Sequence, residues 1–332
     1  MSCLTMPKRQ LGKKGPNVSA IGFGMMGLSI CYGAVASDEE RFKILDRAIE
    51  LGCTYFDTAD VYGDSEDLLG KYFKKCPQQR QKVFLATKFA GVVSADLKSF
   101  SVRGDAEYVH QAIIKSLGHL QLDYVDLYYV HRIDPKVPIE ETMNALKELV
   151  RQGKIKYIGL SECSSDTIRR AYAIHPIACV QIEYSPFSLD IEKDEIAVLK
   201  TCRELGVAIV CYSPLGRGML TGQIKKNFPK NLDLVKKLAS IAAKKGCTTG
   251  QLTLAWILAQ GPDFIPIPGT SKVRNLEENV GAAQVKLTTD EINEIRTACN
   301  AADVAGGRAP EQFSLNTFGD SAPKKEVSNY HE

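Results

Sequence analysis

YVDLYYVH at residues 124–131 and IKYIGLS at residues 155–161 flank an amphipathic pattern, and this unit sets the architecture of the chain. Both flanking segments are short, apolar and rich in β-branched and aromatic residues, which is typical of buried strands. The segment between them begins at Pro138 and ends at Gly153, residue types that favour the first turn and the end of a helix. A strand, a helix and a second strand in this order predict two parallel strands joined by a helical crossover.

The same alternation continues on both sides of this unit. The further strand patterns are VSAIGFG (18–24), TYFDT (54–58), KVFLATK (82–88), ACVQIEYS (178–185), VAIVCYS (207–213) and DFIPIPG (263–269). Ser37 and Glu40 predict a capping box at the start of one helix, and Asp194 is expected to begin another that stops at Gly206. The chain therefore contains eight strands separated by helices.

The residues at the strand ends distinguish a closed barrel from an open, doubly wound sheet, the two arrangements that cover both faces of parallel strands. Seven strands end in a polar residue or glycine, namely Asp57, Lys88, His131, Ser161, Gln181, Ser213 and Gly269. A barrel brings all of these ends to one mouth, whereas an open sheet would spread them over roughly 34 Å. We therefore expect an α/β protein with a (β/α)8 TIM barrel.

Both ends of the chain are expected to add to a barrel core of about residues 18–285. Residues 9–12 and 15–18 have the pattern of a hairpin that plugs the barrel floor, with Gly and Pro in its turn. From about Thr288 the sequence predicts a final helix and then a tail that is loop or partly disordered. The length would also suffice for two ordinary domains, but we expect one domain over residues 1–332, with 286–332 as its C-terminal helix and tail.

The composition is that of a globular protein with a small-molecule ligand. The chain is 44% hydrophobic and 24% charged, and its net charge of +3 comes from 42 basic and 39 acidic residues scattered along the sequence. It lacks the clustered positive charge that nucleic acid or an anionic membrane surface would require. We recognise no signal peptide and no apolar run of membrane-spanning length, which predicts a cytoplasmic protein. The 10 cysteines form no C-x-x-C pair and no metal-spaced cluster, so we expect reduced thiols and no metal site.

GFGMMG at residues 22–27 matches the G-x-G-x-x-G pattern of dinucleotide-binding turns. Such a turn opens a helix directly and is followed about 20 residues later by an acidic residue for the ribose. Here a loop is expected to follow, with the next helix starting only near Asp38. We therefore interpret Gly24 as a position where a ligand approaches the first strand closely.

DTADVYGDSE at residues 57–66 carries the most specific signal in the chain. It resembles the D-T-A-x-x-Y-G-x-x-E signature of the aldo-keto reductase superfamily, and by that resemblance Asp57, Tyr62, Lys88 and His131 form a catalytic tetrad. The resemblance continues through GLS (159–161), Gln181, YSPLG (212–216) and IPGTS (267–271), and so covers nearly the whole chain. It is closest to the branch of perakine reductase-like and pyridoxal reductase-like enzymes. It implies NADP(H)-dependent reduction of an aldehyde or ketone to the alcohol, with Tyr62 as the general acid.

Physical chemistry independently explains why these four residue types would act together. A phenol has a pKa near 10, so proton donation at neutral pH needs a nearby cation such as Lys88. A buried ammonium stays charged when a carboxylate such as Asp57 pairs with it. A neutral His131 would donate a hydrogen bond to the substrate oxygen as negative charge develops there. Each residue alone has a structural explanation as a cap, a rim residue or a wall residue, but the four together favour catalysis.

The resemblance also implies an extended cofactor across the mouth. Tyr212 would stack on the nicotinamide, and Ser161 and Gln181 would hold its carboxamide, although core packing and strand-end capping would also explain Tyr212 and Ser161. The family usually has Asn where this chain has Glu162. The implied contacts of the phosphates and adenine are Ser213, Pro214, Leu215, Gly216, Arg217, Gly269, Thr270, Ser271, Lys272, Glu278 and Asn279.

Many relatives have Lys and Arg where this chain has Gly269 and Asn275. Any charge for the 2'-phosphate of NADPH must therefore come from Lys272, with Arg274 as a helper. For these two residues the start of a solvated helix is the alternative interpretation.

Two other functions are compatible with this sequence. A regulatory subunit that binds the nucleotide with weak or no turnover shares the fold and the cofactor site, and another barrel enzyme, such as a phosphate-binding isomerase, would use none of the tetrad. The substrate is a small carbonyl compound, and Tyr32, Phe89 and Arg132 are expected to line its pocket. Specificity is expected in the segment after Gly91, in residues 219–232 and in the tail from residue 306. The sequence leaves a monomer and a homo-oligomer equally open.

Overall fold

Eight parallel strands form the centre of the computed structural model, which describes residues 6–30, 33–93, 100–222, 229–305 and 317–324. They are β3 (Phe23–Gly24), β4 (Tyr55–Asp57), β5 (Phe84–Phe89), β8 (Val125–Val130), β9 (Ile155–Ser161), β10 (Cys179–Glu183), β11 (Ala208–Tyr212) and β12 (Phe264–Pro266). Their order in the sheet follows the chain, from β3 at one edge to β12 at the other. A parallel bridge between Gly24 and Gly269 joins these two edges, so the predicted (β/α)8 barrel is confirmed.

The seam between β3 and β12 depends on close backbone approach. The amide of Gly22 donates to Pro266 O at 2.9 Å, and the amide of Gly24 donates to Pro268 O at 3.3 Å. A Cβ atom on Gly24 would lie 2.7 Å from Ile267 O, and one on Gly269 would lie 2.7 Å from Gly24 O. Since real Cβ atoms do not approach that closely, glycine is required on both sides of the seam.

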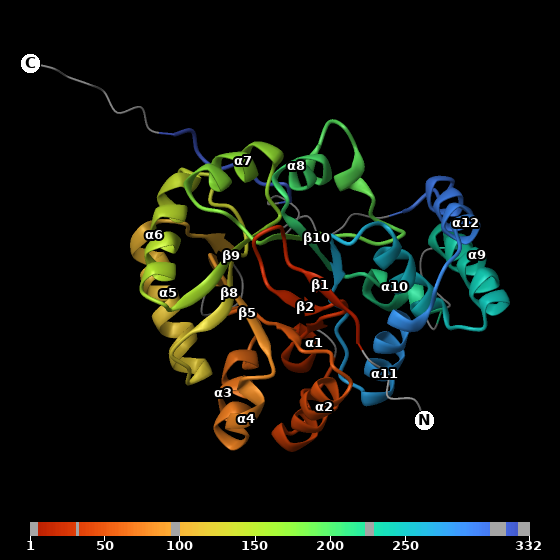
Figure 1. The fold of residues 1–332 in the computed structure, drawn as a ribbon, viewed down its shortest axis with the longest axis horizontal. Helices are drawn as coiled ribbons and strands as arrows, with labels where there is room; N and C mark the ends of the chain where they lie inside the picture. Colours follow the sequence, from red (N-terminus) through yellow and green to blue (C-terminus); the bar gives the residue numbers. More distant parts are fainter. Residues whose placement is uncertain (1–5, 31–32, 94–99, 223–228, 306–316, 325–332) are drawn as a thin grey trace, which may run out of the picture.

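Helices follow the strands and surround them, as Figure 1 shows. The longer ones are α2 (Asp38–Glu50), α3 (Ser65–Lys75), α5 (Ala106–Leu120), α6 (Ile139–Arg151), α7 (Ser165–Ile174), α8 (Val198–Leu205), α9 (Pro229–Lys245), α10 (Thr249–Ala259), α11 (Val273–Gly281) and α12 (Thr289–Asn300). Ser37 caps α2 by accepting the amide of Glu40, and complete capping boxes begin α10 and α12. The final helix from Thr288 is therefore confirmed.

The shorter elements lie in the connections. They are the helices α1 (Met26–Ser29) and α4 (Pro77–Arg80), the 3-10 turns η1 (Asp190–Glu192), η2 (Gly216–Thr221) and η3 (Ala282–Gln284), and an antiparallel pair of β6 (Gly91–Val93) with β7 (Phe100–Val102). Helix α1 corrects the sequence analysis, which expected no helix before Asp38. It is only one turn long, and the amide of Met25 is bonded to Asp57 O.

The predicted hairpin plug is present at the floor of the barrel. Strands β1 (Lys8–Gln10) and β2 (Asn17–Ser19) pair in antiparallel register, and Figure 1 shows them in red against the middle of the barrel. Leu11 and Val18 are buried in the inner core, with Tyr55, Leu127 and other side chains of the barrel strands. Arg9 fixes the hairpin by donating to three carbonyl oxygens, of Leu258, Gly261 and Phe264. Apolar contact and these hydrogen bonds close the floor.

Two predicted boundaries are wrong. The expected strand 18–24 is two pieces, because Val18 and Ser19 pair with the hairpin and the chain bends before Phe23 and Gly24 join β4. The expected helix from Asp194 begins only at Val198. Its N-cap, Ala197, has a left-handed backbone with φ +50°, which an α-helix does not continue through.

The described part of the tail packs against the barrel. Gly319 bridges to Cys163 and Ala322 bridges to Pro138. The amide of Gly319 donates to Glu162 O at 2.8 Å, and Arg170 donates to Ala322 O at 2.8 Å. Residues 317–324 form a loop, as expected for the tail, and their backbone groups find partners in the wall; residues 306–316 and 325–332 lie outside the described part.

The described residues also bear on disulfides, metal binding and membrane insertion. The eight cysteines in the described ranges are all free thiols. Within those ranges, no three His, Cys, Asp or Glu side chains gather where they could hold a metal ion. In the described part of the chain, we also find no helix with both the length and the apolar character needed to cross a bilayer.

Candidate active site

Three neighbouring strands and one loop bring the predicted tetrad together. Asp57 is the last residue of β4, Lys88 lies near the end of β5, and His131 directly follows β8. Tyr62 lies on the loop from β4 to α3, where its amide closes a turn by donating to Ala59 O at 3.1 Å. The order β4, β5, β8 around the barrel makes these strand ends neighbours.

Lys88 is the centre of the cluster. Its side chain is fully buried, and Nζ donates to Asp57 Oδ1 at 2.5 Å, to Thr58 O at 2.9 Å and to the Tyr62 hydroxyl at 3.3 Å. These contacts use the three donors of an ammonium group. The same Nζ lies 4.7 Å from the centroid of the Tyr62 ring. A positive charge is thereby fixed beside the phenol oxygen.

The electrostatics of the buried pair favour that charge. Burial alone lowers the pKa of Lys88, but the Asp57 carboxylate and the Tyr62 oxygen outweigh it, and the pKa of Lys88 lies above its ordinary value. Burial raises the pKa of Asp57, against the opposing effects of Lys88 and Gln181. Because the acid and the ammonium are in contact, we treat them as an ion pair.

His131 faces Tyr62 across the mouth. The two ring centroids are 5.7 Å apart, with the rings nearly perpendicular. Burial, then the positive charges of Lys88 and Arg132, hold the pKa of His131 well below its ordinary value, so the ring is neutral at pH 7. Its Nδ1 is buried and has no hydrogen-bond partner among the described residues. The side chain is thus in the state required to donate one hydrogen bond to a ligand oxygen.

Gln181 links the tetrad to the predicted cofactor wall. It pairs with Ser161 in the ladder of β9 and β10, and both side chains are buried. The amide nitrogen of Gln181 donates to Asp57 Oδ2 at 2.7 Å. The sequence analysis did not foresee this contact, because it assigned Gln181 only to the cofactor. Asp57 is therefore held by Lys88 through one oxygen and by Gln181 through the other.

Tyr212 is the last residue of strand β11, and its hydroxyl group is hydrogen-bonded to Glu162. The Tyr212 hydroxyl donates to Glu162 Oε1 at 2.9 Å, and the amide of Glu183 donates to the same oxygen at 3.3 Å. Glu162 is fully buried and has a left-handed backbone with φ +49°. The only sequence signal for this arrangement was Glu in place of the family's Asn.

The loop after β11 has a backbone suited to an anion. It contains the predicted residues Ser213, Pro214, Leu215, Gly216 and Arg217. Leu215 lies near the bridge region (φ −103°, ψ +18°) and Gly216 follows with φ +54°. These two conformations in succession curve the backbone as in a nest, the kind of turn that binds phosphate oxygens in proteins, and the amide of Gly216 closes this turn by donating to Ser213 O at 2.9 Å. The loop therefore fits a pyrophosphate.

The predicted 2'-phosphate residues lie at the start of α11, and the predicted adenine residues lie near its end. Lys272 is the exposed N-cap of this nine-residue helix, and its amide donates to Thr270 Oγ1 at 3.1 Å. Ser271 and Arg274 are also exposed. Asn279 is buried, and Glu278 accepts the Thr248 hydroxyl at 2.7 Å. The helix N-terminus and the two cations leave this rim positive.

Of the three predicted substrate residues, Arg132 lies at the mouth and Phe89 lies away from it, while Tyr32 is outside the described part of the chain. Arg132 is half-buried at the mouth and donates to His131 O at 2.9 Å. Phe89 is fully buried, and its ring stacks on Tyr128 with centroids 4.8 Å apart, in the outer core between strands and helices. Tyr32 lies outside the described residues, as do parts of the three expected specificity segments.

Asp60 is an acidic residue of the mouth that sequence reasoning did not single out. It occupies a variable position of the DTADVYGDSE segment, so the motif gives no signal for it. Its Oδ1 is buried and finds no hydrogen-bond partner within the described ranges. Burial and the nearby Glu66 raise the pKa of Asp60 to about 8.

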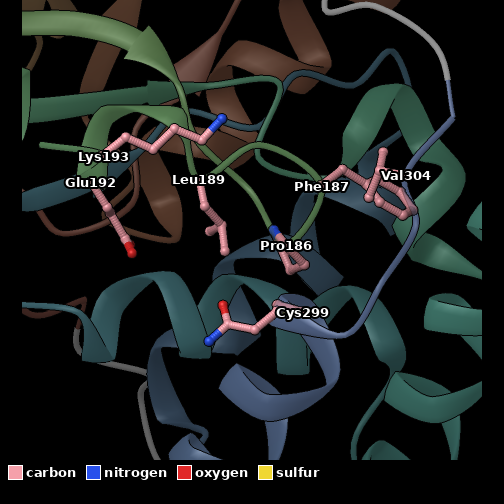
Figure 2. A pocket seen from close by; sticks show the side chains of 8 residues that line it. Pro186, Phe187, Leu189, Glu192, Lys193, Cys299 and Val304 are labelled. Atoms are coloured by element: carbon pink, nitrogen blue, oxygen red, sulfur yellow. The ribbon is translucent and has the colours of Figure 1, made fainter. Parts of the chain in front are cut away.

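A separate groove of about 360 Å³ lies between the loop after β10 and the end of α12. Figure 2 shows Pro186 and Leu189 on one wall and Cys299 on the other. Its Phe187 ring backs the anion loop, because a Cβ on Gly216 would lie 2.7 Å from that ring. None of the tetrad residues lines this groove.

Comparisons with known proteins identify the family of this chain. A model of the aldo/keto reductase family matches residues 20–300. The chain is 51% identical over 329 residues to the aldo-keto reductase str7 of Strobilurus tenacellus, covering 92% of this chain and 95% of that protein. It is 46% identical over 341 residues to the aldo-keto reductase yakc of Schizosaccharomyces pombe, whose name specifies NADP(+), covering 96% and 99%. Among solved structures, a thermostable aldo-keto reductase in complex with the inhibitor epalrestat matches with a TM-score of 0.75 and 32% identity, covering 88% of this chain and 100% of that one.

Proposed function

The chain belongs to the aldo/keto reductase family and is an oxidoreductase, and we propose that it reduces an aldehyde or ketone to the alcohol with NADPH, using Tyr62 as the proton donor. The observation that carries this proposal is the position of Lys88 Nζ, 2.5 Å from Asp57 Oδ1 and 3.3 Å from the Tyr62 hydroxyl. A buried cation in this position stabilises the phenolate that remains after Tyr62 has given up its proton.

The other residues of the mouth have complementary roles in this proposal. A bound NADPH would supply the hydride that reaches the carbonyl carbon. Neutral His131 donates a hydrogen bond to the carbonyl oxygen, orienting the substrate and stabilising the negative charge that develops there. Tyr62 then transfers its proton to that oxygen, which completes the alcohol. Gln181 and Lys88 keep Asp57 in place as the counter-charge.

We assign the cofactor to the same rim. Tyr212 would hold the nicotinamide by stacking, Ser161 and Gln181 would hold its carboxamide, and the backbone amides around Leu215 and Gly216 would hold the pyrophosphate. The exposed ammonium of Lys272, at the N-terminus of α11, selects the 2'-phosphate. The name of the Schizosaccharomyces pombe relative, which specifies NADP(+), supports this choice of cofactor.

Turnover tests the proposal directly. The wild-type protein should oxidise NADPH steadily when given aromatic aldehydes, quinones, pyridoxal or methylglyoxal. Tyr62→Phe keeps the ring and removes the proton, so kcat should fall by about 100-fold or more while NADPH binding stays nearly unchanged. Activity within a few-fold of the wild type would reject Tyr62 as the acid, and tight NADPH binding without turnover on any carbonyl would favour a regulatory nucleotide-binding subunit.

A further inference from the structure

Arg132 lies at the mouth with part of its guanidinium group unused. It follows His131 at the end of β8, and its side chain is half-buried. Its Nη1 donates to His131 O at 2.9 Å and approaches Ser161 Oγ at 3.5 Å, while its Nε and Nη2 donate to no atom of the residues that the structure describes. A guanidinium group has five N–H donors and stays charged in proteins. Arg132 therefore offers a positive charge and a free pair of donors beside the tetrad.

The other buried or half-buried arginines of the described ranges have partners for their charge or for their donors. Arg9 donates to three carbonyl oxygens at the floor. The remaining ones form ion pairs, Arg41 with Asp64, Arg47 with Glu277, Arg80 with Asp126, Arg170 with Glu140 and Arg296 with Glu192. Arg132 has no such pair with a carboxylate in the part of the chain that the structure describes. Because shielding an uncompensated charge from water is unfavourable, an anionic ligand would gain from binding there.

This cation lies next to the place where the carbonyl group would bind. The ring of His131 faces that of Tyr62 with the centroids 5.7 Å apart, and the proposed function has both residues bind the carbonyl oxygen. Burial, then the charges of Lys88 and Arg132, lowers the pKa of His131, so the guanidinium is near enough to act on this imidazole. Ser161, at the end of β9, is on the proposed nicotinamide side. Arg132 thus lies where a substrate between nicotinamide and acid could reach it.

We propose that Arg132 binds a carboxylate group of the substrate, so that the protein reduces carbonyl compounds that also carry an acid group. This inference rests on the proposed function and names the class of its substrate. Nε and Nη2 form one edge of the planar guanidinium group, and their two N–H bonds match the two oxygens of a carboxylate. Lys88, the cation of the tetrad, already uses its three donors. A singly charged carboxylate balances the one charge of Arg132 better than a phosphate dianion does.

Pairs of substrates that differ only in the acid group test this proposal. We would measure kcat/KM for phenylglyoxylate and for the meta and para isomers of carboxybenzaldehyde, each against its methyl ester, at saturating NADPH and one ionic strength. These acids hold the carboxylate at different distances from the carbonyl carbon. We expect the wild type to favour at least one acid over its ester. Arg132→Gln should reduce that preference by about tenfold to 100-fold, mainly through KM, because a charge-assisted contact is lost.

Arg151→Gln is the matched control, because it removes the same charge from an exposed ion pair with Glu148 on α6, and its ratio of acid to ester should equal that of the wild type. Arg132→Lys keeps the charge but loses the paired N–H groups, so it should restore only part of the preference. A wild type that favours no acid over its ester, or an equal loss on acids and esters in Arg132→Gln, would overturn the inference and leave the proposed function standing. A wild type that turned over none of these compounds and no other carbonyl would instead overturn the proposed function, and this inference with it.

Discussion

The floor and the mouth of this barrel are built by the same strands, yet they differ in nearly every physical respect. At the floor, Leu11 and Val18 of the hairpin pack on apolar strand residues, and Arg9 donates to carbonyl oxygens. At the mouth, Asp57 and Lys88 are buried charges held by specific hydrogen bonds. Strand β4 joins the two regions, since it carries Tyr55 in the inner core and Asp57 at the site.

Most of the described non-glycine residues with positive φ lie on the mouth side, and Gln121, at the end of α5 on the floor side, is an exception. Ala90, Glu162 and Ser213 have positive φ and follow β5, β9 and β11 at the mouth. Such residues raise the free energy of the folded state, and proteins retain them mainly where function requires a particular geometry. We infer that packing at the floor stabilises the folded state and that backbone strain at the mouth offsets part of this stabilisation. Variants in each region should therefore have distinct effects.

Lys88→Met should have the largest effect, because it removes the central cation of the mouth. We expect kcat to fall about 100-fold or more, and the free energy of unfolding to fall by about 3 to 5 kcal/mol, since Asp57 would remain buried without its partner. Steady-state kinetics and denaturant titration measure the two losses. Combining Lys88→Met with Tyr62→Phe should add little further loss of kcat, and fully additive losses would show that the two residues do not act as a unit.

Leu11→Ala is the corresponding change at the floor. Leu11 is fully buried in the inner core, so its truncation should lower the free energy of unfolding by about 2 to 5 kcal/mol while kcat and KM stay near wild-type values. Thermal or denaturant unfolding checks the loss. Ile114, which is exposed on α5, provides the control, because Ile114→Ala should change stability little. A large fall in kcat for Leu11→Ala would contradict the division between floor and mouth.

Asp60→Asn should raise the free energy of unfolding by an amount that grows as the pH rises. The pKa of Asp60 in the folded protein is about 8, above that of an unfolded aspartate. Ionisation of Asp60 therefore lowers the stability of the wild type as pH rises from about 4 to 8, and the asparagine variant escapes this loss. We expect an advantage near zero at pH 4 that grows to about 2 kcal/mol or more at pH 8, measured by unfolding at several pH values. Asp57→Asn should instead destabilise the protein, because it leaves Lys88 unpaired.

Lys272→Ala should have the smallest effect, because this cation is exposed at the rim. Losing one charge-assisted contact should weaken NADPH binding by about tenfold and leave NADH binding unchanged. The two affinities must be compared at one ionic strength, since salt screens an exposed contact. Equal losses for both nucleotides, or a wild type that binds NADH as well as NADPH, would show that the 2'-phosphate lies elsewhere.

The sequence predicted what depends on strand order and on strand ends. Asp57, Lys88 and His131 could be assigned to one mouth because parallel strands that follow one another around a barrel end on the same side. The sequence analysis also assigned Phe89 to the substrate pocket, and the structure does not support this. Phe89 directly follows Lys88 in β5, and Lys88 faces the site. Successive residues of a strand point to opposite faces, and Phe89 accordingly stacks on Tyr128 in the outer core.

Contacts between distant segments could not be predicted. Nothing in the local sequence indicates that Gln181 donates to Asp57, or that residues 317–322 bind the wall at Glu162 and Arg170. Backbone turns were equally hidden, because Ala197 and Glu162 are not residue types that usually adopt a positive φ. The helix start at Val198 and the position of the Glu162 side chain both depend on such turns.

The seam between β3 and β12 has a mechanical consequence for the whole ring of strands. Proline has no N–H group, so Pro266 and Pro268 accept bonds from Gly22 and Gly24 and return none. The seam is therefore joined by few backbone hydrogen bonds, and it lies beside the rim segment 269–272. Local opening begins where the fewest backbone bonds must break. The barrel can thus loosen next to its proposed nucleotide rim while the ladders from β4 to β11 stay intact.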